Sequence, residues 1–221
     1  MALTMIRKCS DLGTAYILAP ERYDPRRDID AQEAGKRVED VAKIVRNTVQ
    51  PTAELGCCLV LDTGDAREGI VISRTRPKEA LKIGSAKKTI QPGDVIISRL
   101  RPYLRQAAYV DKGILHSHGV QILCSTEFFV LRSVDEQSIA FLVPFLLSSR
   151  VQEILGASQE GGHHPRFNDF ALSTLPIPAT VLDARDTTSR AIERSIALYR
   201  ESEATIADAI RQAEETKVGQ T

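Results

Sequence analysis

Three arginines, a proline and a tyrosine lie close together in one short stretch, and they define the chemistry that this chain offers most plainly. The stretch follows an apolar run and comprises Arg99, Arg101, Pro102, Tyr103 and Arg105. Guanidinium groups carry planar sets of donors that suit a phosphate or the edge of guanine, and a tyrosine ring provides a stacking face. Neither a nucleophile nor a general base accompanies them. The stretch predicts binding to phosphates or bases, and the alternative is a solvated strand end with surface ion pairs.

Two further groups of residues could bind the same kind of ligand. Lys87 and Lys88 follow small turn residues, and they would either contact a nucleic-acid backbone or line a solvated turn. The loop at residues 161–168, GGHHPRFN, holds polar side chains between glycines and a proline, as a binding loop does. Its candidate DNA contacts are His163, His164, Arg166 and Asn168. Asparagine can read adenine and arginine can read guanine, so this loop could supply base contacts.

The surroundings of these candidates are basic, although the whole chain is neutral. Formal net charge is zero over 221 residues, yet residues 70–112 hold ten lysines and arginines against three acidic residues. In residues 182–221, eight acidic residues outnumber six basic ones. This polarisation is expected if one region meets an anion and another does not.

Short apolar runs separated by turn residues predict that a β-rich domain positions the loops. Strands are expected at residues 57–61, 69–72 and 95–97, the last preceded by a turn at Pro92, Gly93 and Asp94. The apolar residues 128–131 predict another strand, which we expect to share a sheet with 95–97. The spacing favours a compact, mostly antiparallel domain. No glycine-rich nucleotide-binding pattern occurs, and no cofactor is expected.

Short helices are expected around this domain. Residues 31–45 place valines at three- and four-residue steps, which predicts an amphipathic helix that covers the core. Residues 133–136 have the form of a capping box, which would start a helix through residue 146 with a kink or break at Pro144. A second helical piece is expected over residues 151–156, ending at Gly156.

A much longer helix is predicted near the C-terminus. Residues 186–216 contain neither proline nor glycine, and at 1.5 Å per residue they would span about 45 Å. Apolar residues recur along one face in alternating four- and three-residue steps, with Glu203 where one is missing. The expected dimerisation seam consists of Ile192, Ile196, Tyr199, Ile206 and Ile210. A helix of this length with an apolar seam requires a partner helix, as in a coiled coil.

The remaining reactive side chains support neither a metal site nor a catalytic site. The four cysteines show no C-x-x-C spacing, so we expect buried thiols in a reducing cytoplasm. His116 and His118 could be combined with the other two histidines in a zinc site, but no carboxylate or cysteine has a supporting spacing. Ser125 and Glu127 could be read as nucleophile and base, yet strand-like surroundings favour a structural role.

The sequence shows the pattern of neither a signal peptide nor a membrane span, which favours a cytoplasmic location.

Four motifs in one order resemble a known family. They are PGDVIISRLRPYLRQAAYV (92–110), CSTEFFVLR (124–132), HHPRFND (163–169) and LPIPA (175–179). Together they look like a target-recognition domain of the type I restriction–modification specificity subunit. The segment ERYDP (21–25) lies where that family often has a similar tyrosine-rich segment.

The resemblance implies a fold and a set of partners. A full specificity subunit is similar to two such units in tandem, held apart by an antiparallel pair of long helices, with each unit reading half of a split DNA site. In the family this subunit is not catalytic. A methyltransferase supplies S-adenosylmethionine and the adenine-modifying site, and a separate translocase subunit cuts the DNA. This chain departs from the family in length, since it resembles half of a full subunit.

The sequence therefore predicts an α+β protein with a β-rich target-recognition domain at residues 1–180 and a long C-terminal helix at 181–221. Its expected work is sequence-specific recognition of double-stranded DNA, without enzymatic activity, in a restriction–modification or related phage-defence complex. Expected partners are a DNA methyltransferase, a restriction or translocase subunit, and a second copy that pairs through the helix to read a split palindrome.

Two other hypotheses stay open. The first is a scaffold that does not bind DNA and docks on a methyltransferase or nuclease through the long helix. The second is a small hydrolase or nuclease that uses the histidines.

Overall fold

The structure is a computed structural model that describes residues 34–72, 77–114, 120–160 and 165–218, together with residues 6, 8 and 9. The tyrosine-rich segment 21–25 and all four histidines lie outside the described residues.

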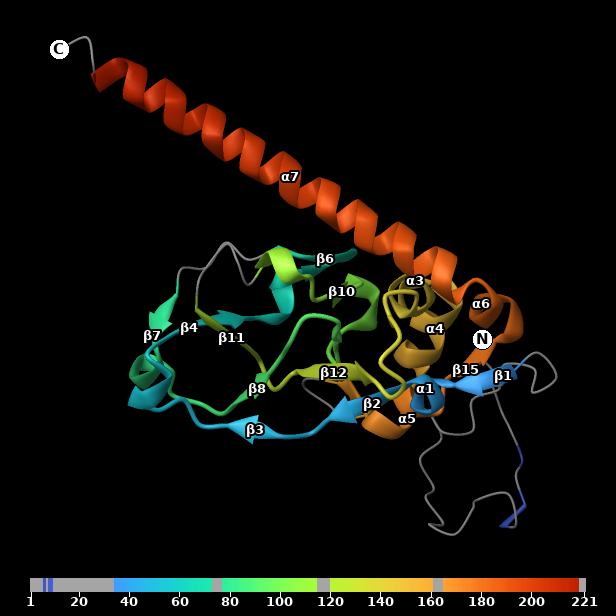
Figure 1. Cartoon of the computed structure of the whole chain (residues 1–221). Helices are drawn as coiled ribbons and strands as arrows, with labels where there is room; N and C mark the ends of the chain where they lie inside the picture. The colour runs from blue at the N-terminus through green and yellow to red at the C-terminus, as the bar shows by residue number, and fades with distance from the viewer. Residues whose placement is uncertain are drawn as a thin grey trace.

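Two mixed sheets form the body of the described chain (Figure 1). The larger contains, in spatial order, β2 (Ala42–Val45), β12 (Phe128–Ser133), β9 (Val95–Ser98), β10 (Ala107–Tyr109), β6 (Gly69–Val71) and β5 (Ala66–Arg67). The smaller contains β3 (Thr48–Val49), β8 (Lys87–Thr89), β11 (Gln121–Cys124), β4 (Cys57–Leu61) and β7 (Lys78–Glu79). Two short pairs join β1 (Ala34–Arg37) to β15 (Pro176–Pro178) and β13 (Gln159–Glu160) to β14 (Arg166–Phe167).

Antiparallel pairing dominates, as the sequence predicts. Among the described strands, only β10 with β6 and β11 with β4 pair in parallel. The expected partnership of residues 95–97 and 128–131 is confirmed, because β9 and β12 run antiparallel with Ile97 opposite Phe129.

β9 and β12 separate two hydrophobic cores, because successive side chains on a strand point to opposite faces. Ile97 and Phe129 belong to the core that includes the helices α3 (Leu142–Leu147) and α4 (Ser149–Ala157). Ile96 and Val130 belong to the core shared with β4 of the smaller sheet. The loops that leave β9 and β12 are therefore rooted in strands that are buried on both faces.

A buried ion pair fixes the start of β9. Asp94 is fully buried, and its carboxylate accepts two hydrogen bonds of 2.8 Å from Arg132 on β12 and one of 2.9 Å from the backbone N–H of Gln91. The hydrogen bonds to Asp94 raise the pKa of Arg132. The turn predicted at residues 92–94 therefore also connects β9 to β12 through the ion pair of its aspartate with Arg132.

The prediction of a helix over residues 31–45 is wrong. Residues 34–45 form β1, a single turn α1 (Val38–Val41) and then β2. Val38 and Val41 are buried, as the helical pattern required, but the β-branched Ile44 pairs opposite Leu131 of β12. Cross-strand pairing at the edge of the large sheet outweighed the helical periodicity.

The prediction that a capping box at residues 133–136 starts a helix is also wrong. Ser133 ends β12, its hydroxyl bonds to Asp135 at 2.9 Å, and the helix α3 starts only at Leu142. Pro144 then falls in the first turn of α3, where its missing N–H would have no partner in the helix anyway, so it neither kinks nor splits the helix. The second helical piece is confirmed as part of α4.

The remaining helices are α5 (Asp169–Ser173), α6 (Ala179–Asp183) and α7 (Arg185–Val218). The predicted long helix is confirmed: α7 has 34 residues, about 51 Å at 1.5 Å per residue, and passes over the domain before projecting beyond it (Figure 1). Among the described residues, no helix combines the length and the apolar content that a membrane crossing requires.

Candidate nucleic-acid interface

The loop between β9 and β10 is short and held in a strained conformation. It contains a single 3-10 turn, Pro102–Leu104, with Arg101 before it at φ 45° and Arg105 after it at φ 54°. Both angles lie in the left-handed region, which costs a non-glycine residue about 1–2 kcal/mol. Strain of this kind persists only where the surrounding structure fixes the backbone, and it concentrates at functional sites. The loop is therefore presented in one defined shape.

Glu127 joins three segments beneath this loop. Arg166 donates two hydrogen bonds, of 2.9 and 2.7 Å, to its carboxylate, and Arg99 Nε lies 3.9 Å from the same group. The backbone N–H of Arg99 also donates to the carbonyl of Glu127 at 2.9 Å, and that of Phe167 donates to the carbonyl of Arg99 at 3.2 Å. The hydrogen bonds to Glu127 raise the pKa of Arg166. The β9–β10 loop, the β11–β12 turn and β14 thus behave as one unit.

Two predicted cations lie near the same aromatic ring. The guanidinium carbon of Arg99 and the ammonium of Lys88 are each 5.5 Å from the centre of the Phe129 ring. Lys88 is only 8% exposed and donates to the carbonyl of Phe128 at 2.7 Å, while burial lowers its pKa. The ammonium of Lys88 is therefore engaged inside the domain and does not face a ligand.

Two other candidates have evident local structural roles. Lys87 is half-buried, and its ammonium donates to the hydroxyl and carbonyl of Ser85 in the preceding turn. Asn168 is the N-cap of α5, where its side-chain oxygen accepts a 2.9 Å hydrogen bond from the N–H of Ala171. Asparagine is strongly preferred at that position, so the cap alone explains the residue type.

The exposed end of the loop carries the other predicted residues. Tyr103 is 71% exposed and Leu104 is 45% exposed. Arg105 lies 3.7 Å from the carboxylate of Glu68, and both side chains are open to solvent. Arg101 is exposed, and no acidic partner lies within ion-pair distance among the described residues.

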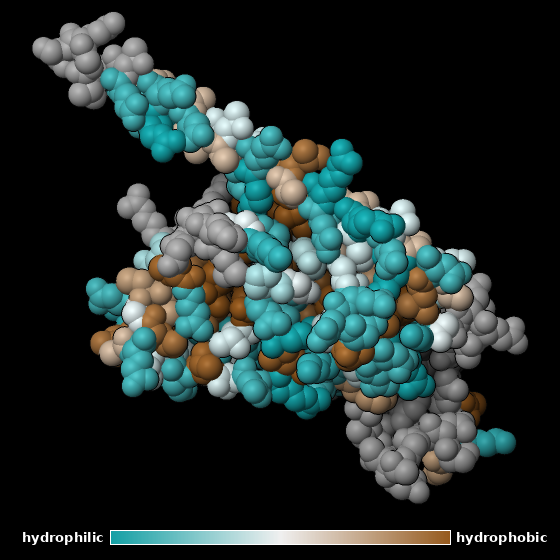
Figure 2. Space-filling model, viewed as in Figure 1, coloured by the Kyte–Doolittle hydropathy of each residue, from teal (hydrophilic) through white to brown (hydrophobic). Residues whose placement is uncertain are grey.

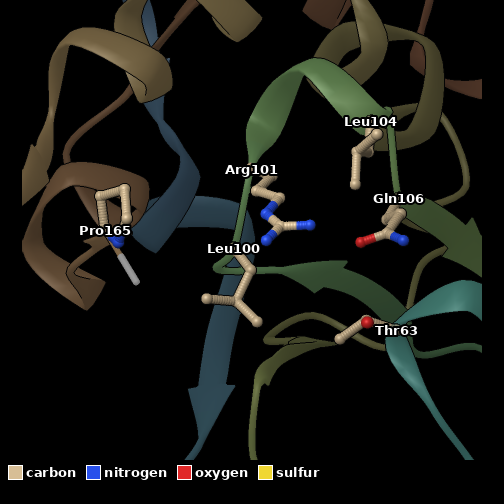
Figure 3. A pocket seen from close by; sticks show the side chains of 6 residues that line it. All are labelled: Thr63, Leu100, Arg101, Leu104, Gln106 and Pro165. Atoms are coloured by element: carbon tan, nitrogen blue, oxygen red, sulfur yellow. The ribbon is translucent and has the colours of Figure 1, made fainter. Parts of the chain in front are cut away.

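A cavity of about 290 Å³ opens beside Arg101 (Figure 3). Its lining residues come from the β9–β10 loop, from the segment after β4 and from the approach to β14: Thr63, Leu100, Arg101, Leu104, Gln106 and Pro165. Sequence reasoning missed Thr63 and Gln106. Gln106 directly follows the arginine-rich stretch and could have been suspected, whereas nothing near Thr63 in the sequence connects it to this loop.

The histidine hypotheses rest on residues that the structure does not describe. His163 and His164 of the predicted binding loop, and His116 and His118, all lie outside the described ranges. Within those ranges, no three His, Cys, Asp or Glu side chains are grouped to hold a metal ion.

The predicted dimerisation residues divide into two groups along α7. Ile196 is 2% exposed and packs against the chain's own domain, and Ile192 and Tyr199 are half-buried. Ile206 and Ile210 are 58% and 56% exposed. Of the predicted seam residues, Ile196 is therefore already buried, whereas Ile206 and Ile210 are exposed.

Polar contacts hold the proximal half of α7 on the domain. Arg185 donates two hydrogen bonds to Asp135, of 2.8 and 2.9 Å, and Arg200 donates to Asp111 and to the carbonyl of Val71. The hydrogen bonds from Arg185 hold the pKa of Asp135 well below its ordinary value.

Between these two ion pairs, Glu193 accepts from the hydroxyls of Tyr109 and Ser138 at 3.1 and 2.6 Å. Burial and the adjacent Glu193 raise the pKa of Tyr109 to about 12, so its hydroxyl remains a donor at neutral pH.

These features define a β-rich domain that presents a rigid, cation-bearing loop and is mounted on the side of a long helix. Among solved structures, that is the fold of the type I restriction–modification specificity subunit, so the predicted resemblance is confirmed at the level of the fold.

Two solved structures illustrate the match. One is a chain from a structure concerned with complex assembly and conformational transition of the type I restriction–modification system, 24% identical with a TM-score of 0.57, covering 81% of this chain and 46% of that chain. Another is the HsdS subunit from Thermoanaerobacter tengcongensis, 22% identical with a TM-score of 0.56, covering 82% of this chain and 46% of that one. The chain spans about half the length of both. Neither a protein family nor a curated protein matches the sequence.

Proposed function

We propose that the chain recognises double-stranded DNA in a sequence-specific manner, as a non-catalytic specificity component of a restriction–modification or related defence complex in the cytoplasm. The observation that carries the proposal is the exposed Arg101, held in a strained backbone conformation at the mouth of a cavity on this fold. A rigid cation costs little ordering entropy when a phosphate or base binds it. Phosphate contacts would fix the position of the duplex, and a few side chains would read bases.

The residues predicted from the sequence take different roles in the proposed interface. Arg101, Tyr103 and Arg105 form its exposed part, and Arg99 and Arg166 support it through Glu127. His163 and His164 remain proposed contacts, because they directly precede Pro165 at the cavity. Lys87 and Asn168 are assigned peripheral roles, since the described contacts account for them.

The test is a fluorescence-anisotropy titration of labelled duplex DNA at low salt, with Arg101→Ala plus Arg105→Ala in the full chain. We expect the double variant to lose duplex binding while keeping its melting temperature, because both side chains are exposed. The charge-matched control is Arg37→Ala plus Arg190→Ala, two exposed arginines away from the loop, which should bind as the unchanged chain does. Unchanged affinity in the loop variant would refute the assignment.

The proposal extends to assembly. We assign residues 1–180 to recognition and 181–221 to docking, with Ile206 and Ile210 on the exposed apolar face of α7 as the contact with a second copy. Two copies would restore the two recognition units implied by neighbours of about twice this length. A two-fold dimer would read a split palindrome, with the paired helices setting the gap between half-sites. A DNA methyltransferase and a translocase subunit are the proposed further partners.

A second candidate function is a scaffold that docks a methyltransferase or nuclease through α7 without binding DNA. The pairing of Arg99, Arg105 and Arg166 with acidic residues favours it, because paired cations attract phosphate less. This candidate predicts no salt-dependent affinity for DNA, so the same titration separates the two.

A further inference from the structure

The polar side chains around the β9–β10 loop fall into two classes. Arg99 and Arg166 face Glu127, and Arg105 faces Glu68, so each of these three cations has a carboxylate within 4 Å. Arg101 and Gln106 differ, because no described residue bonds to the guanidinium of the first or to the side-chain amide of the second. The backbone carbonyl of Gln106 is engaged by the N–H of Ser98 at 2.9 Å, which fixes the position from which its side chain extends.

Both side chains enter one cavity. Figure 3 shows the Arg101 guanidinium and the Gln106 amide pointing into the space between the loop and Thr63. The rest of the wall consists of the apolar side chains of Leu100, Leu104 and Pro165. The two polar residues stand at either end of the Pro102–Leu104 turn, whose flanking left-handed residues hold it in shape.

We infer that Arg101 and Gln106 are the pair that reads bases directly, with Arg101 specifying a guanine and Gln106 an adenine in the adjacent base pair. This inference rests on the proposed function. Arginine donates two hydrogen bonds to O6 and N7 of guanine, and glutamine exchanges two with N6 and N7 of adenine. Because both side chains line a single cavity of about 290 Å³, the bases that they reach belong to neighbouring steps of the stack.

A phosphate is the less suitable partner for the side chains that line this cavity. Phosphate oxygens only accept hydrogen bonds, so they would use the guanidinium but leave the carbonyl half of the Gln106 amide unmatched. The apolar wall from Leu100 and Leu104 gives a phosphate nothing to bond, whereas it can contact a thymine methyl group in the major groove. The paired arginines outside the cavity are better placed to accompany the backbone.

The test is selection of bound sequences from a random duplex library by the full chain, repeated with single variants. The unchanged chain should return a guanine beside an adenine in each half-site. Gln106→Glu should replace adenine by cytosine at that position, since a carboxylate accepts from cytosine N4. Gln106→Ala should lose the preference there, and Arg101→Ala should lose the guanine with roughly ten- to hundredfold weaker binding to the selected site.

Different outcomes of this selection would refute base reading by Gln106 and DNA recognition by the chain. The control Gln137→Glu changes an exposed amide near the base of α7 and should select the original sequence. If the unchanged chain binds a defined sequence and Gln106→Glu and Gln106→Ala both select that same sequence, the inference is overturned and DNA recognition stands. If the unchanged chain selects no sequence and shows no salt-dependent binding, the proposed function fails and the inference fails with it. Thermal melting of each variant verifies that it is folded.

Discussion

At the scale of single residues, the arginines of this chain look equivalent in the sequence and prove different in the structure. Residue type and spacing singled out the arginine-rich stretch, which the structure places in an exposed loop with two left-handed residues. They could not identify Glu127, which lies 39 positions from Arg166 and on a different strand connection, as the acid that neutralises it. Nor could they show that Lys88 is buried, because the β-pleat that turns it inward depends on pairing with β11.

Replacing Glu127 tests this division of roles. Glu127→Gln removes the carboxylate that faces Arg99 and Arg166, so both guanidiniums become available to phosphates. We expect tighter binding to unrelated duplexes, with the slope of log K against log salt steeper by about one phosphate contact, and weaker discrimination of the selected site. Anisotropy titrations at several salt concentrations measure both effects. Glu39→Gln, which neutralises an acid in a surface ion pair elsewhere, is the matched control. Weaker binding with an unchanged slope would contradict the assignment of Arg99 and Arg166.

At the scale of elements, periodicity succeeded where an element is long or buried on both faces. The strands β4, β6, β9 and β12 and the helix α7 follow from their apolar patterns. The region of residues 34–45 did not, because its valines satisfy both a helical period and a strand–turn–strand, and only the pairing of β2 with β12 decides between them. The sequence also could not show that the apolar seam of α7 is buried against the domain at Ile196 and exposed at Ile206 and Ile210.

Substitutions on α7 should separate its two halves. Ile196→Glu places a charge at a site that is 2% exposed, so we expect a loss of about 2–5 kcal/mol in the free energy of unfolding. Ile206→Glu changes a 58% exposed residue and should alter that free energy by less than about 0.5 kcal/mol, yet convert a dimer to a monomer. Urea unfolding and light scattering measure the two quantities. A dimer that survives Ile206→Glu together with Ile210→Glu would refute the proposed contact.

The anchor at the start of α7 should be sensitive to acid. Arg185 holds the pKa of Asp135 well below its ordinary value near 3.8, so the folded protein keeps a charged carboxylate that the unfolded chain would protonate sooner. The stabilisation is complete above pH 3.8 and is lost as the pH falls below that value. It amounts to about 1 kcal/mol, because the carboxylate is partly exposed and screened by solvent.

Melting temperatures of the unchanged chain and Asp135→Asn, measured from pH 7 to pH 2, test this anchor. The difference between the two proteins should be constant at neutral pH and shrink below pH 3.8. A difference that grows with acidity would contradict the assignment.

At the scale of the whole molecule, the charge distribution agrees with a recognition domain carried on a helix. The basic excess of residues 70–112 belongs to the domain, and α7 extends beyond that domain with a largely hydrophilic surface interrupted by apolar side chains (Figure 2). The fold is shared with chains of about twice this length. The recognised sequence, in contrast, depends on the placement of a few side chains in one cavity, and no composition or period encodes it.

Binding of the full chain to a labelled random-sequence duplex, measured by anisotropy at a series of salt concentrations, tests the central claim most directly. Binding to phosphates releases counterions, so log K should fall linearly with log salt, with a slope of about −0.9 for each phosphate contact. We expect a clear negative slope that becomes shallower by about one contact in Arg105→Ala. No binding at low salt, or an affinity that does not change with salt, would contradict DNA recognition and leave the docking scaffold as the better account.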